Sequence, residues 1–220
     1  MSRAPRRTLR GLYAITPETR DTQDLVARAE ACLAGGAAAL QYRAKGLSPA
    51  AALEQAQALA AACRRHGALF IVNDSLELAR ATAADGVHLG RDDGDPAAAR
   101  REMPDAIIGI SCYAEPARAR EAAAAGADYV AIGSVFASST KPGAVRAPLQ
   151  ALAEARRQAA RPVVAIGGIT LDNAPLAIGA GADMVAVISA LFDAPDIAAA
   201  ARAFTRLFDA QTTGARDVRP

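Results

Sequence analysis

The sequence contains no tryptophan, few other aromatic residues and only three cysteines. Aromatic side chains make up 4% of the 220 residues, so alanine and aliphatic residues must fill the core, and abundant alanine favours helices that pack closely on strands. Cys32, Cys63 and Cys112 are far apart, odd in number and without metal-ligand spacing, which excludes a disulfide framework and a cysteine metal site. We expect buried thiols without a chemical role in a reducing cytoplasm. For Cys112, which follows a predicted strand end, a position in the wall of a pocket is the less favoured alternative.

Neither a charge excess nor a long apolar run is present. The 25 Lys and Arg residues nearly balance the 23 Asp and Glu residues, so nothing indicates a nucleic-acid partner or a membrane surface. No apolar run is long enough to span a membrane. The basic residues 1–10 lead into Gly11-Leu12-Tyr13 rather than a long apolar stretch, so we expect no signal peptide and a cytoplasmic protein. The oligomeric state is not predicted.

Short apolar runs alternate with helical stretches along the whole chain. The predicted strands are residues 12–16, 38–43, 69–73, 86–90, 107–111, 129–132, 163–166 and 184–188. The predicted helices are 24–34, 48–66, 76–83, one opening at 95, then 115–125, 148–160, 172–180 and about 195–210. Eight strand–helix units predict an α/β fold with a single (β/α)₈ TIM barrel at 11–210. Residues 1–10 form an N-terminal extension, and residues 211–220 are expected to be a disordered tail.

An internal repeat supports this fold. The segments GGAAALQYR, AADGVHLG, AGADYVAIG and AGADMVAVI each place a small-residue turn before an apolar strand. They fall on the second, fourth, sixth and eighth strands, as two-unit repetition in a barrel predicts. An open doubly wound sheet is the alternative, but no strand lies outside the regular alternation and no GxGxxG motif opens a helix.

A basic cluster follows the second strand. Strand alternation places Gln41, Arg43 and Lys45 on one side, at the barrel face where the carboxyl ends of the strands converge. One amide and two cations there suit a polyanion, which arginine can bind through two hydrogen bonds. Pairing of Arg43 with a neighbouring carboxylate is equally compatible with the pattern.

Carboxylates follow the third and fourth strands. Asp74 comes directly after Asn73, and Asp92 and Asp93 follow the fourth strand. Carboxylates on adjacent strand ends beside a basic cluster suit Mg²⁺ that bridges to a diphosphate. For Asp74 alone a helix-capping role is favoured, Asp95 before a proline is expected to cap a helix, and composition does not choose between Asp92 and Asp93.

The fourth and fifth predicted strands also carry polar residues, namely His88 and Ser111. His88 alternates with apolar neighbours and is expected to face the barrel interior, where a hydrogen-bonded structural histidine is favoured over a catalytic one. Ser111 ends the fifth strand, whereas His66 near a helix end is expected to be structural.

A second anion-binding region is predicted after the sixth, seventh and eighth strands. Residues 133–143 form a hydroxyl-rich loop with one lysine, a composition that suits phosphate, although serine-rich loops are commonly plain surface loops. Gly167-Gly168 follows the seventh strand and Ser189 the eighth, where barrels commonly bind phosphate through backbone N–H groups. For the glycine pair alone a tight turn explains the sequence equally well.

The chain resembles the thiamine-phosphate synthase (thiamine-phosphate pyrophosphorylase) family over residues 12–208. The shared motifs are LYAIT, QYRAK, VND, DGVHLG with an aspartate three residues on, GIS, ADYVAIGSVF with STK, AIGGI and VAVIS. The resemblance implies a TIM-barrel transferase of thiamine biosynthesis that requires Mg²⁺ and acts on small phosphorylated molecules. It would join 4-amino-2-methyl-5-hydroxymethylpyrimidine diphosphate to 4-methyl-5-(2-hydroxyethyl)thiazole phosphate and release pyrophosphate.

The resemblance also assigns roles to residues of this sequence by position. It implies a pyrimidine diphosphate site made of Gln41, Tyr42, Arg43, Ala44, Lys45, Asn73, Ser111 and Lys141. It implies a thiazole phosphate site made of Ser138, Ser139, Thr140, Gly168, Ile188 and Ser189. It implies Asp74 and Asp93 as Mg²⁺ ligands, and catalytic roles for Arg43, Lys45, Ser111 and Lys141. Two positions depart from the commoner family pattern, namely Ser138 in place of threonine and Arg91 in place of glutamine.

Two other functions compete with this one. The first is a thiazole tautomerase of the same fold, which would handle only the thiazole phosphate and would not need the diphosphate and metal residues. The second is a non-catalytic barrel that senses a phosphorylated ligand. The expected chemistry needs no general base, because the ring amine stabilises the methylene cation and the protein need only neutralise the leaving pyrophosphate.

Overall fold

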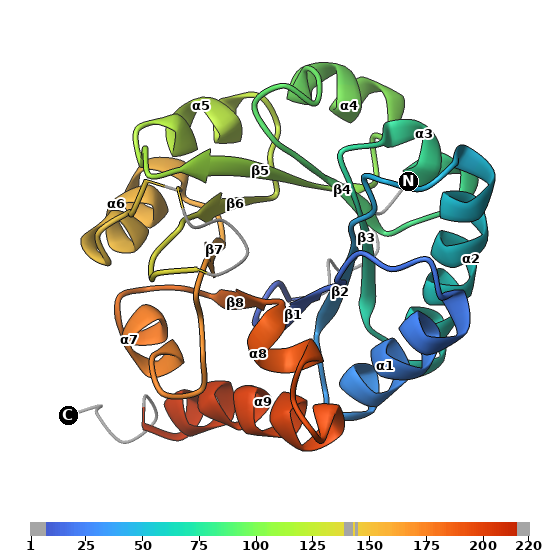
Figure 1. Cartoon of the computed structure of the whole chain (residues 1–220). Helices are drawn as coiled ribbons and strands as arrows, with labels where there is room; N and C mark the ends of the chain where they lie inside the picture. Colours follow the sequence, from blue (N-terminus) through green and yellow to red (C-terminus); the bar gives the residue numbers. More distant parts are fainter. Residues whose placement is uncertain (1–7, 139–142, 144, 215–220) are drawn as a thin grey trace.

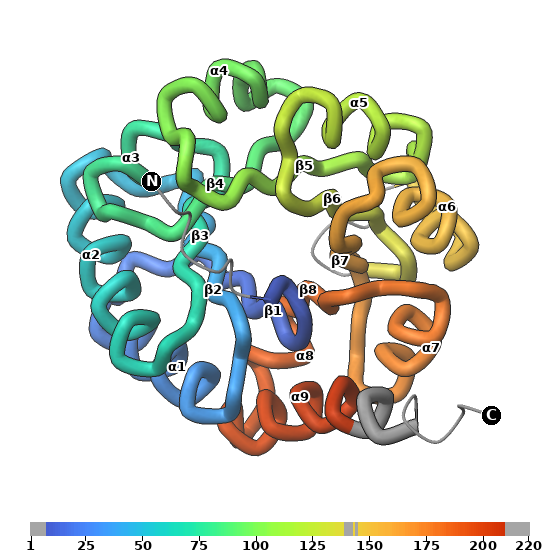
Figure 2. Tube along the Cα trace, turned by 180° about the vertical axis from the view of Figure 1, so that it is seen from behind, coloured from blue at the N-terminus to red at the C-terminus, as the bar shows by residue number. Residues whose placement is uncertain are grey.

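Eight parallel strands close into one barrel, and helices surround it (Figure 1). The structure is a computed structural model that describes residues 8–138, 143 and 145–214. The strands follow one another around the barrel in chain order, and the first pairs with the last to close it, as the view from behind also shows (Figure 2). The predicted TIM barrel is confirmed.

The strand bounds agree with the predicted bounds within two residues. The strands are β1 (Gly11–Ile15), β2 (Ala39–Tyr42), β3 (Leu69–Asn73), β4 (Gly86–Leu89), β5 (Ile107–Tyr113), β6 (Tyr129–Ile132), β7 (Val163–Ile166) and β8 (Met184–Val187). The helices are α1 (Thr22–Ala34), α2 (Pro49–His66), α3 (Leu76–Ala81), α4 (Pro96–Glu102), α5 (Arg118–Ala124), α6 (Gln150–Ala159), α7 (Ala174–Gly179), α8 (Ser189–Phe192) and α9 (Ile197–Gly214).

Three differences from the predicted elements have local causes. The helix expected from residue 115 begins at Arg118, because residues 115–117 form a hydrogen-bonded turn in which Arg118 N donates to Glu115 O. Helix α8 has only four residues, too few for a periodic pattern to reveal it. Helix α9 continues through residue 214, so residues 211–214 of the predicted tail are helical, and the rest of that tail lies outside the described residues.

Strand alternation divides the core into two parts. Residues such as Tyr13 and Ile15 face the barrel interior and form a small inner cluster. Their neighbours Leu12 and Ala14 face outward and join the larger cluster between strands and helices. At the carboxyl end of the interior, polar side chains such as Gln41 and His88 join the apolar ones, and the site described below lies there.

The internal repeat has a structural explanation at the amino ends of the strands. An aspartate in the turn before each of β4, β6 and β8 accepts a hydrogen bond from a backbone N–H of the preceding strand. The pairs are Phe70 N to Asp85 (2.8 Å), Ile108 N to Asp128 (3.0 Å) and Val163 N to Asp183 (2.9 Å). These bonds tie neighbouring strands together, so the repeated turns serve the fold rather than the site.

Side-chain caps begin α2 and α4, and the cap that the sequence predicted at Asp95 is confirmed. Ser48 Oγ accepts from Ala51 N at 3.4 Å, and the α2 helix ends at Gly67 in the left-handed conformation. Asp95 caps α4 by accepting from Ala97 N and Ala98 N. Among the described residues, no helix combines the length and the apolar character that a membrane crossing requires.

Candidate functional site

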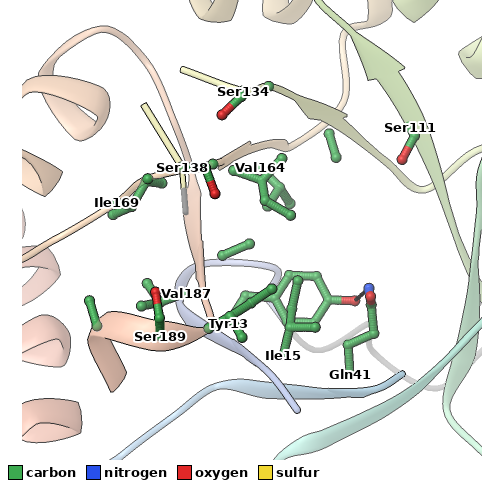
Figure 3. Close-up of a pocket in the computed structure, with 18 of the residues that line it drawn as sticks. Tyr13, Ile15, Gln41, Ser111, Ser134, Ser138, Val164, Ile169, Val187 and Ser189 are labelled. Carbon is green, nitrogen blue, oxygen red and sulfur yellow. Dashed lines mark hydrogen bonds between the residues drawn. The ribbon is translucent and has the colours of Figure 1, made fainter. Parts of the chain in front are cut away.

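A cavity of about 440 Å³ opens at the carboxyl ends of the strands (Figure 3). Its walls include many of the residues singled out in the sequence: Gln41, Arg43, Asn73, Ser111, Ser138, Gly168, Ile188 and Ser189. Gln41 and Ser111 lie on one side of the cavity, and Ser138 and Ser189 lie on the other (Figure 3). The cavity therefore has two polar ends, separated by apolar side chains such as Ile15 and Val164.

The two cations after β2 are both paired with carboxylates. Arg43 lines the cavity, and its Nη1 lies 2.6 Å from Oε1 of Glu18. Lys45 is half-exposed, and its Nζ lies 3.1 Å from Oδ2 of Asp74. The sequence left open whether Arg43 faces an anion site or pairs with a carboxylate. In the structure it lines the cavity and also pairs with Glu18. The pairs are partly exposed, so an incoming polyanion can replace the carboxylates.

The carboxylates after β3 and β4 converge. Asp93 folds back so that Oδ2 accepts from Gly90 N at 2.8 Å, while Asp92 remains exposed. A Cβ at Gly90 would lie 2.6 Å from this oxygen, which explains a glycine three residues before the aspartate. Burial raises the pKa of Asp74, and its hydrogen-bonding contact with Asp93 raises that pKa further. The neighbouring carboxylates of Asp74 and Asp93 therefore provide oxygen atoms that suit a divalent cation.

The expectation that Asp74 caps a helix is wrong. Ser75 caps α3 through a hydrogen bond from Leu78 N to Ser75 Oγ at 3.1 Å. Asp74 has a φ of 66°, a left-handed conformation that aspartate tolerates better than most residues. This conformation turns the chain at the end of β3, where Asp74 meets Lys45 instead of the helix terminus.

Two residues in the implied pyrimidine diphosphate site face away from the cavity. Tyr42 is 2% exposed and donates to Gln55 Oε1 at 2.9 Å, between the barrel and α2. Ala44 packs against the same outer cluster. The Tyr42 side chain therefore does not line the cavity, because strand alternation turns it outward when Gln41 and Arg43 face the cavity.

At the opposite end of the cavity, glycine allows close backbone packing. Gly167 and Gly168 have φ values of 99° and 63°. A Cβ at Gly168 would overlap the carbonyl oxygen of Ala137, and one at Gly167 would overlap Ser134. The pair is therefore more than a tight turn, since only glycine lets the chain after β7 approach the loop after β6. Asn173 fixes this segment by donating to Gly168 O at 2.9 Å and accepting from Thr170 N at 2.9 Å.

Hydroxyl groups accompany the glycine backbone. Ser138 and Ser189 both line the cavity, Ser189 as the first residue of α8 (Figure 3). Ser139, Thr140 and Lys141, which the resemblance also implies, lie outside the described residues. The described part of this end thus offers hydroxyls and backbone groups, which suit a phosphate.

A buried hydrogen-bond network joins the strands beneath the cavity. Gln41 Nε2 donates to Tyr13 OH at 2.8 Å, and Tyr13 OH lies 2.8 Å from Tyr129 OH. His88 bridges Tyr129 OH at 2.9 Å and Ser111 Oγ at 2.9 Å. His88 therefore lies in the interior with both ring nitrogens hydrogen-bonded, as the sequence favoured. Burial lowers the pKa of His88 to about 4, against an opposing effect of Asp93, so its ring is neutral.

Several cavity residues are absent from the candidates identified in the sequence. Tyr13 and Ile15 lie in the LYAIT motif, and Ser134 lies in the GSVF motif. Strand alternation could have identified Tyr13 and Ile15, because they face the interior when their neighbours Leu12 and Ala14 face outward. Burial raises the pKa of Tyr13 well above its ordinary value, so its phenol stays protonated.

Arg91, one of the two expected departures from the family pattern, makes local contacts. Its Nη2 lies 2.5 Å from Oε1 of Glu115, and its guanidinium lies 5.2 Å from the centroid of the Tyr113 ring. The Tyr113 hydroxyl also accepts from Arg91 N at 3.0 Å. The extra positive charge is thus balanced beside the cavity by Glu115.

A family model, two relatives and one solved structure are similar to this chain over most of its length. A family model for thiamine monophosphate synthase matches residues 12–191. A thiamine-phosphate synthase of Aromatoleum aromaticum is 58% identical over 207 residues, which cover 94% of this chain and 100% of that protein. One of Azoarcus sp. is 56% identical over 201 residues, with 91% and 98% covered. A solved thiamine phosphate pyrophosphorylase from Pyrococcus furiosus has a TM-score of 0.82 at 36% identity and covers 92% of this chain and 96% of its own.

Proposed function

The chain belongs to the thiamine monophosphate synthase family, and we infer that it is a transferase of thiamine biosynthesis. It joins 4-amino-2-methyl-5-hydroxymethylpyrimidine diphosphate to 4-methyl-5-(2-hydroxyethyl)thiazole phosphate, which gives thiamine phosphate and pyrophosphate. The observation that carries this function is one cavity with two polar ends. Gln41, Arg43, Asn73 and Ser111 supply one end, and Ser138, Gly168 and Ser189 supply the other.

The first end suits the diphosphate. Arg43 presents a guanidinium to the cavity, and Asn73 and Ser111 add neutral hydrogen-bonding groups. Lys45 lies beside them, within 3.1 Å of Asp74. When the bond from the methylene carbon to the diphosphate oxygen breaks, both bonding electrons leave with the diphosphate. Arg43, Lys45 and Ser111 then stabilise the added negative charge, and Lys141 is assigned to the same task from the sequence.

The second end suits the thiazole phosphate. Ser138 and Ser189 are hydroxyl donors, and the close approach of Gly168 to Ala137 leaves no side chain between backbone and ligand. Ser139, Thr140 and Ile188 are assigned to this end from the sequence. Anchoring the phosphate here points the thiazole ring toward the centre of the cavity, where its nitrogen donates an electron pair to the methylene carbon.

The donor set fits Mg²⁺. Asp74 and Asp93 place two carboxylates in contact beside the diphosphate end. No cluster of three or more His, Cys, Asp or Glu side chains occurs among the described residues, so phosphates and water would complete the coordination, as Mg²⁺ prefers. Bound there, Mg²⁺ would neutralise charge on the leaving pyrophosphate.

A reducing compartment such as the cytoplasm suits the three cysteines. Cys32, Cys63 and Cys112 are buried free thiols, and burial raises the pKa of each to about 12. Neutral buried thiols have no catalytic use in this reaction.

One assay tests the function directly. Purified protein is mixed with both substrates and Mg²⁺, and thiamine phosphate and pyrophosphate are quantified over time. We expect equimolar products that depend on both substrates and on Mg²⁺. Conversion of the thiazole phosphate alone would establish the tautomerase instead, and stable binding of both substrates without product would establish a sensor.

A further inference from the structure

Five polar side chains form a continuous hydrogen-bonded chain across the barrel interior. In order they are Gln41, Tyr13, Tyr129, His88 and Ser111, with successive distances of 2.8, 2.8, 2.9 and 2.9 Å. They come from β2, β1, β6, β4 and β5, so residues distant in sequence meet at one level. Both ends, Gln41 and Ser111, line the cavity, and Figure 3 shows the first bond of the chain between Gln41 and Tyr13.

The number of hydrogens fixes the direction of this chain. An amide nitrogen only donates, so Tyr13 OH accepts from Gln41 and has its single hydrogen left for Tyr129. Tyr129 then accepts from Tyr13 and donates to His88 Nδ1. A neutral imidazole carries one N–H, which must therefore be at Nε2 and donate to Ser111 Oγ.

The direction leaves defined groups at the two ends. Ser111 Oγ already accepts from His88, so its own hydrogen is available to the cavity. Gln41 uses its nitrogen on Tyr13, so its carbonyl oxygen is available to accept. The end of the cavity formed after β2 to β5 therefore presents two groups: a donor at Ser111 suited to an anion, and an acceptor at Gln41 suited to a ring amine.

The central residues are held firmly in place. Tyr13 and Tyr129 pack edge to face with ring centroids 5.9 Å apart, and His88 stacks on Tyr129 at 5.5 Å. Gly109 makes room for Tyr129, because a Cβ there would overlap the phenol ring. Tyr13, Tyr129 and His88 are 2%, 1% and 8% exposed, so bulk water cannot readily replace these bonds.

We propose, on the basis of the function inferred above, that Tyr13, Tyr129 and His88 are positioning residues that aim the Ser111 hydroxyl hydrogen at the leaving diphosphate. The same one-way chain aims the Gln41 carbonyl oxygen at the amine of the pyrimidine. No proton is transferred along the chain, since the reaction breaks one carbon–oxygen bond, forms one carbon–nitrogen bond and needs no base. The chain removes the cost of reorienting Ser111 when charge develops on the diphosphate.

The direction is measurable independently of activity. The sequence has two histidines, so ¹⁵N-histidine labelling of the whole protein gives two rings, and His66→Gln leaves His88 alone. His66 is a suitable residue to replace because it contacts Glu30 at the surface. We expect His88 to carry its hydrogen on Nε2 and none on Nδ1, and Tyr129→Phe to leave a mixture of both tautomers. A hydrogen on Nδ1 in the otherwise native protein would overturn the proposal.

The kinetic test asks whether Tyr129 acts through Ser111. Tyr129→Phe should lower kcat about tenfold, the equivalent of one lost hydrogen bond, with KM for the thiazole phosphate changed less than about twofold. In a Ser111→Ala background the same change should lower kcat less than about twofold further. Tenfold losses in both backgrounds would overturn the proposal, because Tyr129 would then act without Ser111.

A matched control tests for a general effect of losing a buried hydroxyl. Thr82→Val removes a 2.8 Å bond from Thr82 Oγ1 to Leu78 O on α3, away from the cavity. It should leave kcat unchanged within about twofold. A tenfold loss in this variant would show that any buried hydroxyl matters equally and would overturn the specific role. Absence of turnover in the unaltered protein would reject the proposed function, while the labelling result would still decide the direction of the chain.

Discussion

The two ends of the cavity offer different groups to a negatively charged ligand. The end formed after β2 to β5 uses charged side chains that the protein already pairs with one another, namely Arg43 with Glu18 and Lys45 with Asp74. The end formed after β6 to β8 uses hydroxyls and a glycine backbone with positive φ at Gly168. The first end can neutralise a charge that grows during the reaction, and the second can hold a charge that stays constant.

This difference predicts how substitutions divide between kcat and KM. A group that meets the developing charge on the leaving diphosphate contributes more in the transition state than in the ground state. A group that holds the unreacting thiazole phosphate contributes equally in both states. Substitutions at the first end should therefore lower kcat, and those at the second should raise KM.

The largest effect is expected at Arg43. Arg43→Ala removes the guanidinium that we propose contacts the diphosphate, and it should cost about 2–4 kcal/mol of transition-state stabilisation. Lys141→Ala should have a loss of the same size, as its place in the sequence motif implies. Steady-state kinetics with both substrates varied measures the change. Rates equal to those of the unaltered enzyme in either variant would remove that residue from the diphosphate end.

A slightly smaller and different effect is expected at Gly168. Gly168→Ala adds a Cβ that would overlap Ala137 O at a φ of 63°, so the backbone must move. We expect KM for the thiazole phosphate to rise roughly ten- to a hundredfold, with a smaller change in kcat. Gly179→Ala on α7 is a matched control, because a Cβ there meets nothing within 4 Å and no positive φ is involved. A fall in kcat with unchanged KM would contradict the division between the two ends.

The third effect is expected at Asp93, one of the two proposed Mg²⁺ ligands. Asp93→Ala should raise the Mg²⁺ concentration needed for half-maximal rate by about tenfold, because one of few protein oxygens is lost. Asp93→Asn can still accept from Gly90 N, so it separates the metal role from the loop contact. Asp92→Ala should change nothing, since Asp92 is exposed.

A Mg²⁺ titration of the initial rate distinguishes the outcomes, with circular dichroism to check the fold. A larger shift for Asp92→Ala than for Asp93→Ala would reverse the assignment of the two aspartates. No shift for either would leave Asp93 as a loop residue that binds only Gly90.

The sequence predicted the parts of this site that depend on strand alternation. Gln41 and Arg43 share the cavity side, as the alternation in β2 requires. Strand alternation no longer predicts side-chain direction beyond the end of β2. Lys45 lies there, and its side chain contacts Asp74 and does not line the cavity. The same rule, applied to Tyr42, would have excluded its side chain from the site.

Other parts depend on backbone conformation and on register between strands. The sequence Gly167-Gly168 does not reveal that both residues have positive φ and lie against the loop after β6. The contact between Tyr13 and Tyr129 joins residues 116 positions apart and arises only when the barrel closes. The sequence also does not reveal the left-handed conformation that turns Asp74 toward Lys45, because the tolerance of aspartate for that conformation is a weak signal.

The smallest effect is expected at Glu18, and it tests whether the pairing at the first end matters in itself. Glu18 Oε1 lies 2.6 Å from Arg43 Nη1, and the two side chains are 42% and 27% exposed. The carboxylate holds the guanidinium at the cavity, but it also repels the incoming diphosphate. Glu18→Gln removes the charge of this carboxylate and keeps an oxygen that accepts from Arg43.

We expect Glu18→Gln to lower KM for the pyrimidine diphosphate about two- to fivefold, with kcat unchanged, because partly exposed pairs are weak. Glu18→Ala removes both charge and contact, so it should lower kcat several-fold as Arg43 loses its fixed position. Steady-state kinetics of both variants at constant ionic strength is the measurement. A higher KM in the glutamine variant would mean that the negative charge of Glu18 helps the diphosphate end, and that its paired side chains do not compete with the substrate.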